Sequence, residues 1–157
     1  MNNTNMNNCV AYPEHCHYIL AVNTLSLISC VYAIYRKHYH LSIVPGGVFL
    51  TSINFWKNPR YDCWERYLDI SYVIIALIYQ SYYAYYAQYG FYYFLITFIG
   101  ILSFIVGKII SNLIQDRNMY LNTNDRKYLS CISILFHSGV HILGNIANII
   151  LYSGKII

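Results

Sequence analysis

Charged residues are scarce in this sequence. Asp, Glu, Lys and Arg make up 10% of its 157 residues, whereas 57% are hydrophobic. An average soluble domain is about one-quarter charged. A soluble fold of this size keeps a large share of its surface in water, so it could not cover so much apolar side-chain area. The composition therefore excludes an ordinary soluble domain and predicts an integral membrane protein.

Several functional signatures are missing as well. The five cysteines form no Cys-x-x-Cys pair, and their odd, unpatterned number argues against a disulfide framework. The formal net charge of +4 is too small and too scattered for a nucleic-acid surface, so no nucleic-acid partner is expected. The first 16 residues contain no Lys or Arg, so we expect no cleavable signal peptide. No phosphate-binding glycine loop and no internal repeat is found.

Five apolar segments follow the polar N-terminal tail, residues 1–16. They are expected at about 17–35, 41–56, 69–86, 91–114 and 128–152. Four of them reach the roughly 17–25 residues that a helix needs to span a bilayer core. The sequence therefore predicts an all-α, multi-pass transmembrane helical bundle with four or five membrane-embedded helices. One transmembrane domain over 17–153 and a short tail at 154–157 complete the expected organisation.

The segment at 41–56 is short and contains Pro45-Gly46-Gly47. Proline suits the first turn of a helix. A helix that began near Pro45 would keep about a dozen residues and rise about 18 Å, short of the roughly 30 Å core. Two interpretations stay open: a re-entrant segment, or a short helix shielded by its neighbours. In both cases the positive-inside rule predicts that the basic loops 57–68 and 115–127 are cytoplasmic.

Tyrosines crowd the region between the third and fourth segments, YQSYYAYYAQYGFYYF, residues 79–94. The short, uncharged link at 88–90 predicts an antiparallel hairpin. Tyrosine prefers the membrane interface, so an aromatic belt at one face of the bilayer is expected. A ligand cage is the alternative.

The last segment carries polar side chains at regular spacing: FHSGVHILGNIANII holds His137, His141, Asn145 and Asn148. Residues four apart share a helix face, so these side chains form one stripe that faces protein or a cavity. Polar side chains bond across membrane helices at about 0.6–2 kcal/mol each, so the stripe fits helix packing. Two histidines four residues apart can also bind zinc. Ionisable groups at membrane depth are functional candidates by default.

Asp69 is an acidic residue at the head of the third apolar segment. A carboxylate there is favoured by the helix dipole. The alternative is a site role, because acids at membrane depth are rare.

Three short motifs carry a resemblance to a known family: Ser52 in TSINFW, Asp69 in RYLDIS, and His137 with His141 in FHSGVH. They resemble the motifs of the alkaline ceramidase and progestin-receptor-type superfamily of membrane hydrolases. That family's pattern is S-x-x-x-H, an Asp at the next helix start, and H-x-x-x-H on a seventh helix. The resemblance, over residues 47–145, implies that the histidines bind zinc while Ser52 and Asp69 hold the attacking water and the oxyanion. Trp56 stands where the family has a third His, and at most five spans replace seven.

Two functions follow. The first is a non-enzymatic membrane protein, structural or partner-binding, with an interhelical polar network and no cofactor. The second is a zinc-dependent intramembrane hydrolase of lipid amides or esters, with His137 and His141 as metal ligands and Ser52 and Asp69 in catalysis. Trp56 favours the first function, and the Ser52–Asp69 spacing favours the second. The expected partners are the lipid bilayer, a lipid ligand or another membrane protein.

Overall fold

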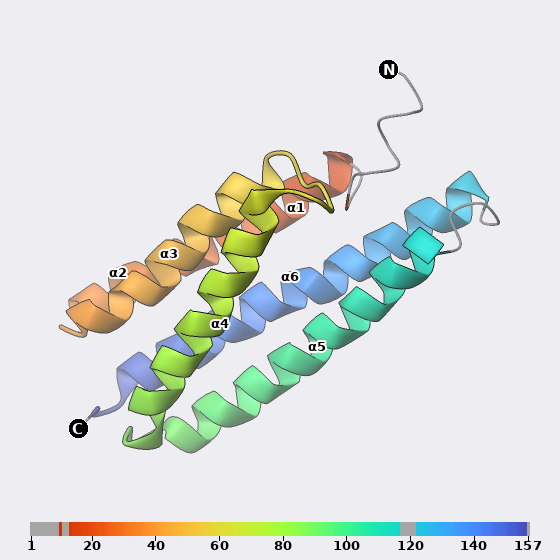
Figure 1. The fold of residues 1–157 in the computed structure, drawn as a ribbon. Coiled ribbons are helices and arrows are strands. Elements are labelled where there is room, and N and C mark those ends of the chain that lie inside the picture. The colour runs from red at the N-terminus through yellow and green to blue at the C-terminus, as the bar shows by residue number, and fades with distance from the viewer. Residues whose placement is uncertain (1–9, 11–12, 117–121, 157) are drawn as a thin grey trace.

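The computed structural model describes residues 10, 13–116 and 122–156. The tail predicted at 1–16 therefore lies largely outside the described residues, as do 117–121 of the loop predicted at 115–127. The described chain is all-α, with no strand but an isolated β-bridge between Ala87 and Ile156. Its helices are α1 (Pro13–Asn23), α2 (Leu25–Tyr35), α3 (Tyr39–Trp56), α4 (Trp64–Tyr85), α5 (Gly90–Asp116) and α6 (Thr123–Ser153) (Figure 1).

Three segments of the described chain are long and apolar enough to cross a membrane. They are His15–Tyr35, Gly90–Ile114 and Asn124–Ser153. The first combines α1 and α2, which are separated by a single turn residue, Thr24. Helix α1 begins at Pro13, ahead of the expected start near His17. The lengths and compositions of these three segments are compatible with an integral membrane protein.

The helices run back and forth between two ends of the molecule (Figure 1). Helix α6 is the centre of the packing, because α1, α2 and α5 all pack against it, whereas α3 packs between α2 and α4. The connection after α2, the α4–α5 turn and the end of α6 lie at one end. The connection at 57–63, the end of α5 and the start of α6 lie at the other.

Helix α3 does not start near Pro45, which is the case in which the sequence would give a short helix. It spans Tyr39–Trp56, 18 residues, with Pro45 inside it. At 1.5 Å per residue it rises about 27 Å, close to the thickness of a bilayer core. The short length inferred from the proline therefore does not apply, and α3 connects the two ends of the bundle (Figure 1).

A hydroxyl from α6 replaces the helical hydrogen bond that Pro45 cannot make. Proline has no N–H, so the carbonyl four residues earlier, that of Leu41, loses its donor. The Tyr152 hydroxyl donates to this carbonyl at 3.3 Å. The same hydroxyl accepts a hydrogen bond from Nε2 of Gln80 on α4 at 2.6 Å. Tyr152 is fully buried, so it joins α3, α4 and α6 at the proline.

Small residues let neighbouring helices approach closely. On α3, a Cβ at Gly47 would collide with the ring and hydroxyl of Tyr72, which donates to the Ile43 carbonyl at 2.8 Å. Between α5 and α6, a Cβ at Gly107 would lie 3.1 Å from the Ser133 carbonyl oxygen. The Ser133 hydroxyl donates to the Gly107 carbonyl at 2.9 Å. Close backbone approach and short polar side chains therefore combine at these contacts, as is usual between membrane helices.

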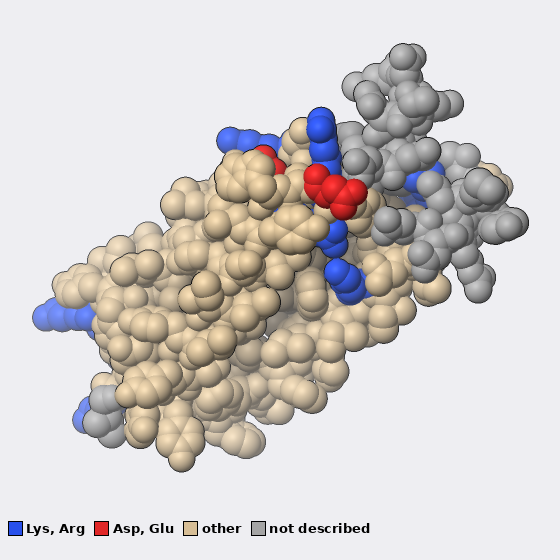
Figure 2. Space-filling model, viewed as in Figure 1, with Lys and Arg blue, Asp and Glu red and all other residues tan. Residues whose placement is uncertain are grey.

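The two ends of the molecule differ in chemistry. Tyrosines surround the α4–α5 turn, and Tyr82 and Tyr85 are 64% and 76% exposed. On the face seen in Figure 2, charged side chains gather at the ends, with acidic and basic groups together at the end that holds the 57–63 connection. The middle of this face is almost free of charge. A band without charged residues, between ends that carry tyrosines and charged side chains, is typical of a membrane protein.

Replacing Tyr152 by Phe should destabilise the bundle. The change removes only the hydroxyl, and it leaves the Leu41 carbonyl and the Gln80 amide buried without this partner. We expect a loss of about 1–2 kcal/mol, the range for polar bonds between membrane helices. Thermal unfolding in detergent, followed by helical circular dichroism, should show a lower midpoint than wild type. Tyr92→Phe, at a 55% exposed position, is the matched control. Equal midpoints for the two variants would contradict the role of Tyr152.

Candidate functional site

The polar stripe on α6 faces inward, as its spacing predicts. His141 and Asn145 are buried, at 8% and 4% exposed, and His137 and Asn148 are half-buried. On the opposite side of the helix Leu135 is 64% exposed and Ile146 is 43% exposed. One face of α6 thus supplies polar groups to the interior while the other is available to lipid.

Asn145 is the best-connected side chain of the stripe. Its Oδ1 accepts a hydrogen bond from the Ser29 hydroxyl at 2.6 Å. Its Nδ2 donates to the Ser26 hydroxyl at 3.2 Å and to the His141 carbonyl at 2.7 Å. An asparagine amide has two donor hydrogens, and both have acceptors here. The amide therefore holds α6 against α2 with both ends satisfied.

The network continues into α1 and α3 through Asn23. The Ser26 hydroxyl lies 3.5 Å from Oδ1 of Asn23. Nδ2 of Asn23 in turn donates to the carbonyl of Phe49 at 3.1 Å. Asn23 is fully buried at the junction between α1 and α2. A chain of side-chain hydrogen bonds thus runs from α6 through α2 and the end of α1 to α3.

Ser52 and Asp69, two of the predicted site residues, form a direct hydrogen bond. The Ser52 hydroxyl donates to Oδ1 of Asp69 at 2.8 Å. A second hydroxyl, that of Thr51, donates to the same oxygen at 2.7 Å. Asp69 is 8% exposed and lies in the second turn of α4, which packs on α3. Two neutral donors from α3 therefore hold one carboxylate oxygen of α4 at the contact between these helices.

His137 and His141 lie next to each other, but aromatic rings surround His137. The two imidazole centroids are 5.3 Å apart. The Trp56 ring meets His137 edge-on at 5.0 Å, and Phe104 lies 6.0 Å away. Trp56 is 3% exposed, so its indole fills the space beside the imidazole.

The described residues do not complete a three-ligand metal site. They contain no cluster of three His, Cys, Asp or Glu side chains that could hold a metal ion. Trp56 packs where the resemblance places a third histidine, and an indole N–H is a donor only, so it cannot replace an imidazole ligand. A zinc site needs at least three protein ligands in most cases. Within the described part of the chain, the two imidazoles therefore lack the third protein ligand that a catalytic zinc usually has.

Asp69 and His137 nevertheless line the same cavity, at the end of the bundle that holds the 57–63 connection. We call it the basic cavity, because Arg66 and Lys108 also line it. Its volume is about 80 Å³, and Trp56 and His137 form part of its wall. The predicted catalytic and metal-ligating residues therefore share one space, although Ser52 is held outside its lining.

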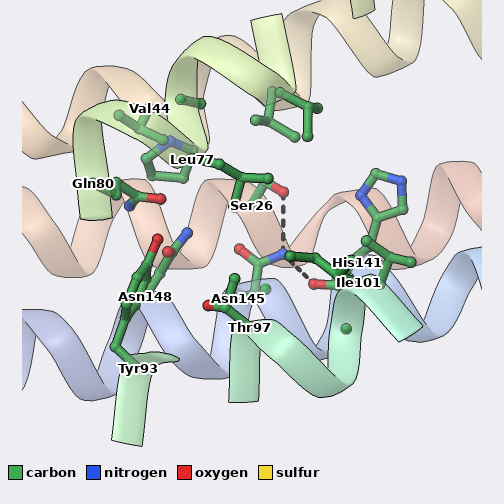
Figure 3. Close-up of a pocket in the computed structure, with 17 residues that line it drawn as sticks. Ser26, Val44, Leu77, Gln80, Tyr93, Thr97, Ile101, His141, Asn145 and Asn148 are labelled. Atoms are coloured by element: carbon green, nitrogen blue, oxygen red, sulfur yellow. Dashed lines mark hydrogen bonds between the residues drawn. The ribbon is translucent and has the colours of Figure 1, made fainter. Parts of the chain in front are cut away.

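A second cavity, the core cavity, lies deeper in the bundle and has a volume of about 120 Å³. Side chains from α2 to α6 line it, and none of its lining residues carries a charged side chain. Figure 3 shows Gln80, Tyr93 and Asn148 at one side of the cavity and His141 at the other, with Ser26 and Asn145 between them. His141 lines this cavity, whereas His137 lines the basic cavity. The histidine pair thus lies between the two spaces.

Sequence reasoning missed the partners of the stripe. Asn23, Ser26 and Ser29 recur every three residues on one face of the first apolar segment, and this spacing was a usable signal. Gln80 was also visible as an amide within an apolar segment. Nothing local indicated Thr51, whose role depends on how α3 meets α4.

Comparison of the chain with family models, with curated proteins and with solved structures finds no match.

Replacing Asn145 by Ala should loosen the contact between α2 and α6. The change leaves the Ser26 and Ser29 hydroxyls without the amide and opens a small void. Because several bonds are lost together, we expect a destabilisation of about 1–3 kcal/mol. The thermal midpoint in detergent should fall, and Asn112→Ala, at an exposed position on α5, should leave it within error of wild type. A midpoint that falls no further for Asn145→Ala than for this control would show that the network is not stabilising.

Proposed function

We propose that this chain is a multi-pass membrane protein with five spans whose role is structural or partner-binding. The spans would be α1 with α2, then α3, α4, α5 and α6. The observation that carries the proposal is the Asn145 network, which satisfies its buried amide entirely with protein groups. An amide whose hydrogen-bonding groups are all satisfied within the protein stabilises the packing of helices, which is a structural role.

The charges at the two ends support an orientation for these spans. The end with the 57–63 connection holds Lys57, Arg60, Arg66, Arg126 and Lys127 among the described residues. The opposite end holds Arg36, Lys37 and Lys155. The positive-inside rule places the more basic end in the cytoplasm, and with it the loops 57–68 and 115–127.

Exposed apolar side chains indicate what the outside of the bundle meets. Phe98 and Ile109 on α5 are more than half exposed, as are Ile75 and Ile78 on α4. Faces of this kind belong against lipid tails or against a helix of another membrane protein. The bilayer is therefore the first partner that we propose, and a membrane-protein partner would use the same faces.

A second candidate function is the zinc-dependent hydrolysis of lipid amides or esters. Two observations favour it: the Ser52–Asp69 hydrogen bond at 2.8 Å, and the cavity shared by Asp69 and His137. Both match the juxtaposition that the resemblance to the ceramidase-type superfamily implies. Trp56 on His137 weighs against it, because it occupies the place of a third ligand.

Metal content distinguishes the two functions. Elemental mass spectrometry on detergent-purified protein should find no stoichiometric zinc in the wild type or in His141→Ala, since two imidazoles do not complete a site. His40→Ala, an exposed histidine, is the matched control. About one zinc per chain that is lost in His141→Ala and kept in His40→Ala would overturn the structural proposal. It would also direct assays to lipid amides.

A further inference from the structure

Helices α4 and α5 diverge from their common turn toward the opposite end of the bundle, and we call the region between them the wedge (Figure 1). Residues of α4, α5 and α6 line both cavities, so the two lie one after the other in this wedge. Figure 2 shows a hollow in the surface there, with basic side chains beside it. The core cavity is neutral, and the basic cavity is at the wide, charged end.

Two cations line the basic cavity. Arg66, in the first turn of α4, donates from its guanidinium to the Tyr61 carbonyl at 2.9 Å and lies 5.4 Å from the centroid of the Tyr61 ring. Tyr61 thereby fixes the direction of the arginine. Lys108, on α5, reaches the cavity from the other side, and its ammonium has no hydrogen-bond or ion-pair partner among the residues that the structure describes. The two cations outnumber the single carboxylate of the lining, that of Asp69.

A buried donor in the same wall lacks an acceptor. The indole Nε1 of Trp56 is buried and has no hydrogen-bond partner within the described part of the chain. A buried donor without a partner is destabilising, because it has lost its hydrogen bond to water and gained none in the protein. An acceptor oxygen on a ligand in the cavity would remove this cost. An anionic group with several acceptor oxygens would therefore match both the two cations and the indole N–H.

The rest of the lining is mainly apolar, with Phe55, Ile70, Phe104 and Ile134 among its residues. A free anion would gain nothing from these side chains, whereas an amphiphile would cover them. The outward faces of α4 and α5 beside the wedge are also apolar, as Ile74 and Ile105 show at 53% and 46% exposed. Acyl chains have a continuous apolar path along these faces.

We propose that the basic cavity binds the phosphate headgroup of an anionic membrane lipid. Arg66 and Lys108 hold the phosphate from two sides, and the Trp56 N–H donates to one of its oxygens. The acyl chains lie in the wedge between α4 and α5. The site is at the more basic end of the bundle, where juxtamembrane Lys and Arg meet anionic lipid headgroups. The binding does not require a metal, so it is compatible with a structural role and with a hydrolase alike.

Native mass spectrometry of the full chain in detergent tests this site. The probes are dioleoyl phosphatidylglycerol, dioleoyl phosphatidylcholine and inorganic phosphate. Wild type should retain one phosphatidylglycerol in preference to phosphatidylcholine by about thirtyfold, since the two cations near the headgroup together contribute roughly 2 kcal/mol. The double variant Arg66→Gln, Lys108→Gln should lose this preference. The control Lys57→Gln, Arg60→Gln removes two exposed cations at the same end that do not line the cavity, and it should keep the preference.

Several results would contradict a lipid site in the basic cavity. Equal loss of the preference in the control pair would show general attraction of anionic lipid to the basic surface. Protection against thermal unfolding by inorganic phosphate, without retention of lipid, would make the free ion the ligand. The proposal would also be overturned if the wild type showed no preference between the two lipids. A dimer mass would overturn it too, because a second copy of the chain would then fill the wedge. If the double variant does not fold, Lys108→Met keeps the test decisive. Lys108 is exposed, and its replacement alone should lower the preference about fivefold.

Discussion

Polar groups in the apolar interior of this bundle need hydrogen-bond partners within the protein, and the structure depends on this constraint. An unpaired backbone group in a bilayer costs several kcal/mol, so a proline within a helix is tolerated only where a neighbour supplies the missing bond. Tyr152 supplies it for Pro45, and Asn145 supplies both ends of its amide to α2 and to its own helix. Helix α6 is central because it carries both of these side chains.

The same constraint explains the chemistry at the site. Asp69 remains buried because two hydroxyls of α3 donate to one of its oxygens. His137 is half-buried, and the aromatic rings of Trp56 and Phe104 pack beside it. Each group thus has a structural reason for its place that requires no reaction. The basic cavity is different. The Lys108 ammonium and the Trp56 indole N–H there have no hydrogen-bond acceptor within the described chain.

The distribution of polarity along the bundle connects the cavities with the membrane. The polar groups that line the core cavity are neutral amides, hydroxyls and an imidazole, whereas Arg66, Lys108 and Asp69 line the basic cavity. Tyrosines gather at the opposite end, around the α4–α5 turn. A lipid whose headgroup lay at the basic end would thus extend its chains toward the tyrosines.

The sequence by itself determined the helical class, the approximate positions of the apolar segments and the inward face of α6, because apolar runs and i, i+4 spacing are local properties. It also placed Ser52 and Asp69 on adjacent segments, where a short connection lets them meet. Only the tertiary structure decided that α3 continues through Pro45, because Tyr152 lies 111 residues from the carbonyl that it satisfies. The tertiary structure alone also decided two other long-range contacts. These are the hydrogen bond between Ser29 and Asn145, which are 116 residues apart, and the ring contact between Trp56 and His137. Such pairings depend on how whole helices pack, which no local pattern encodes.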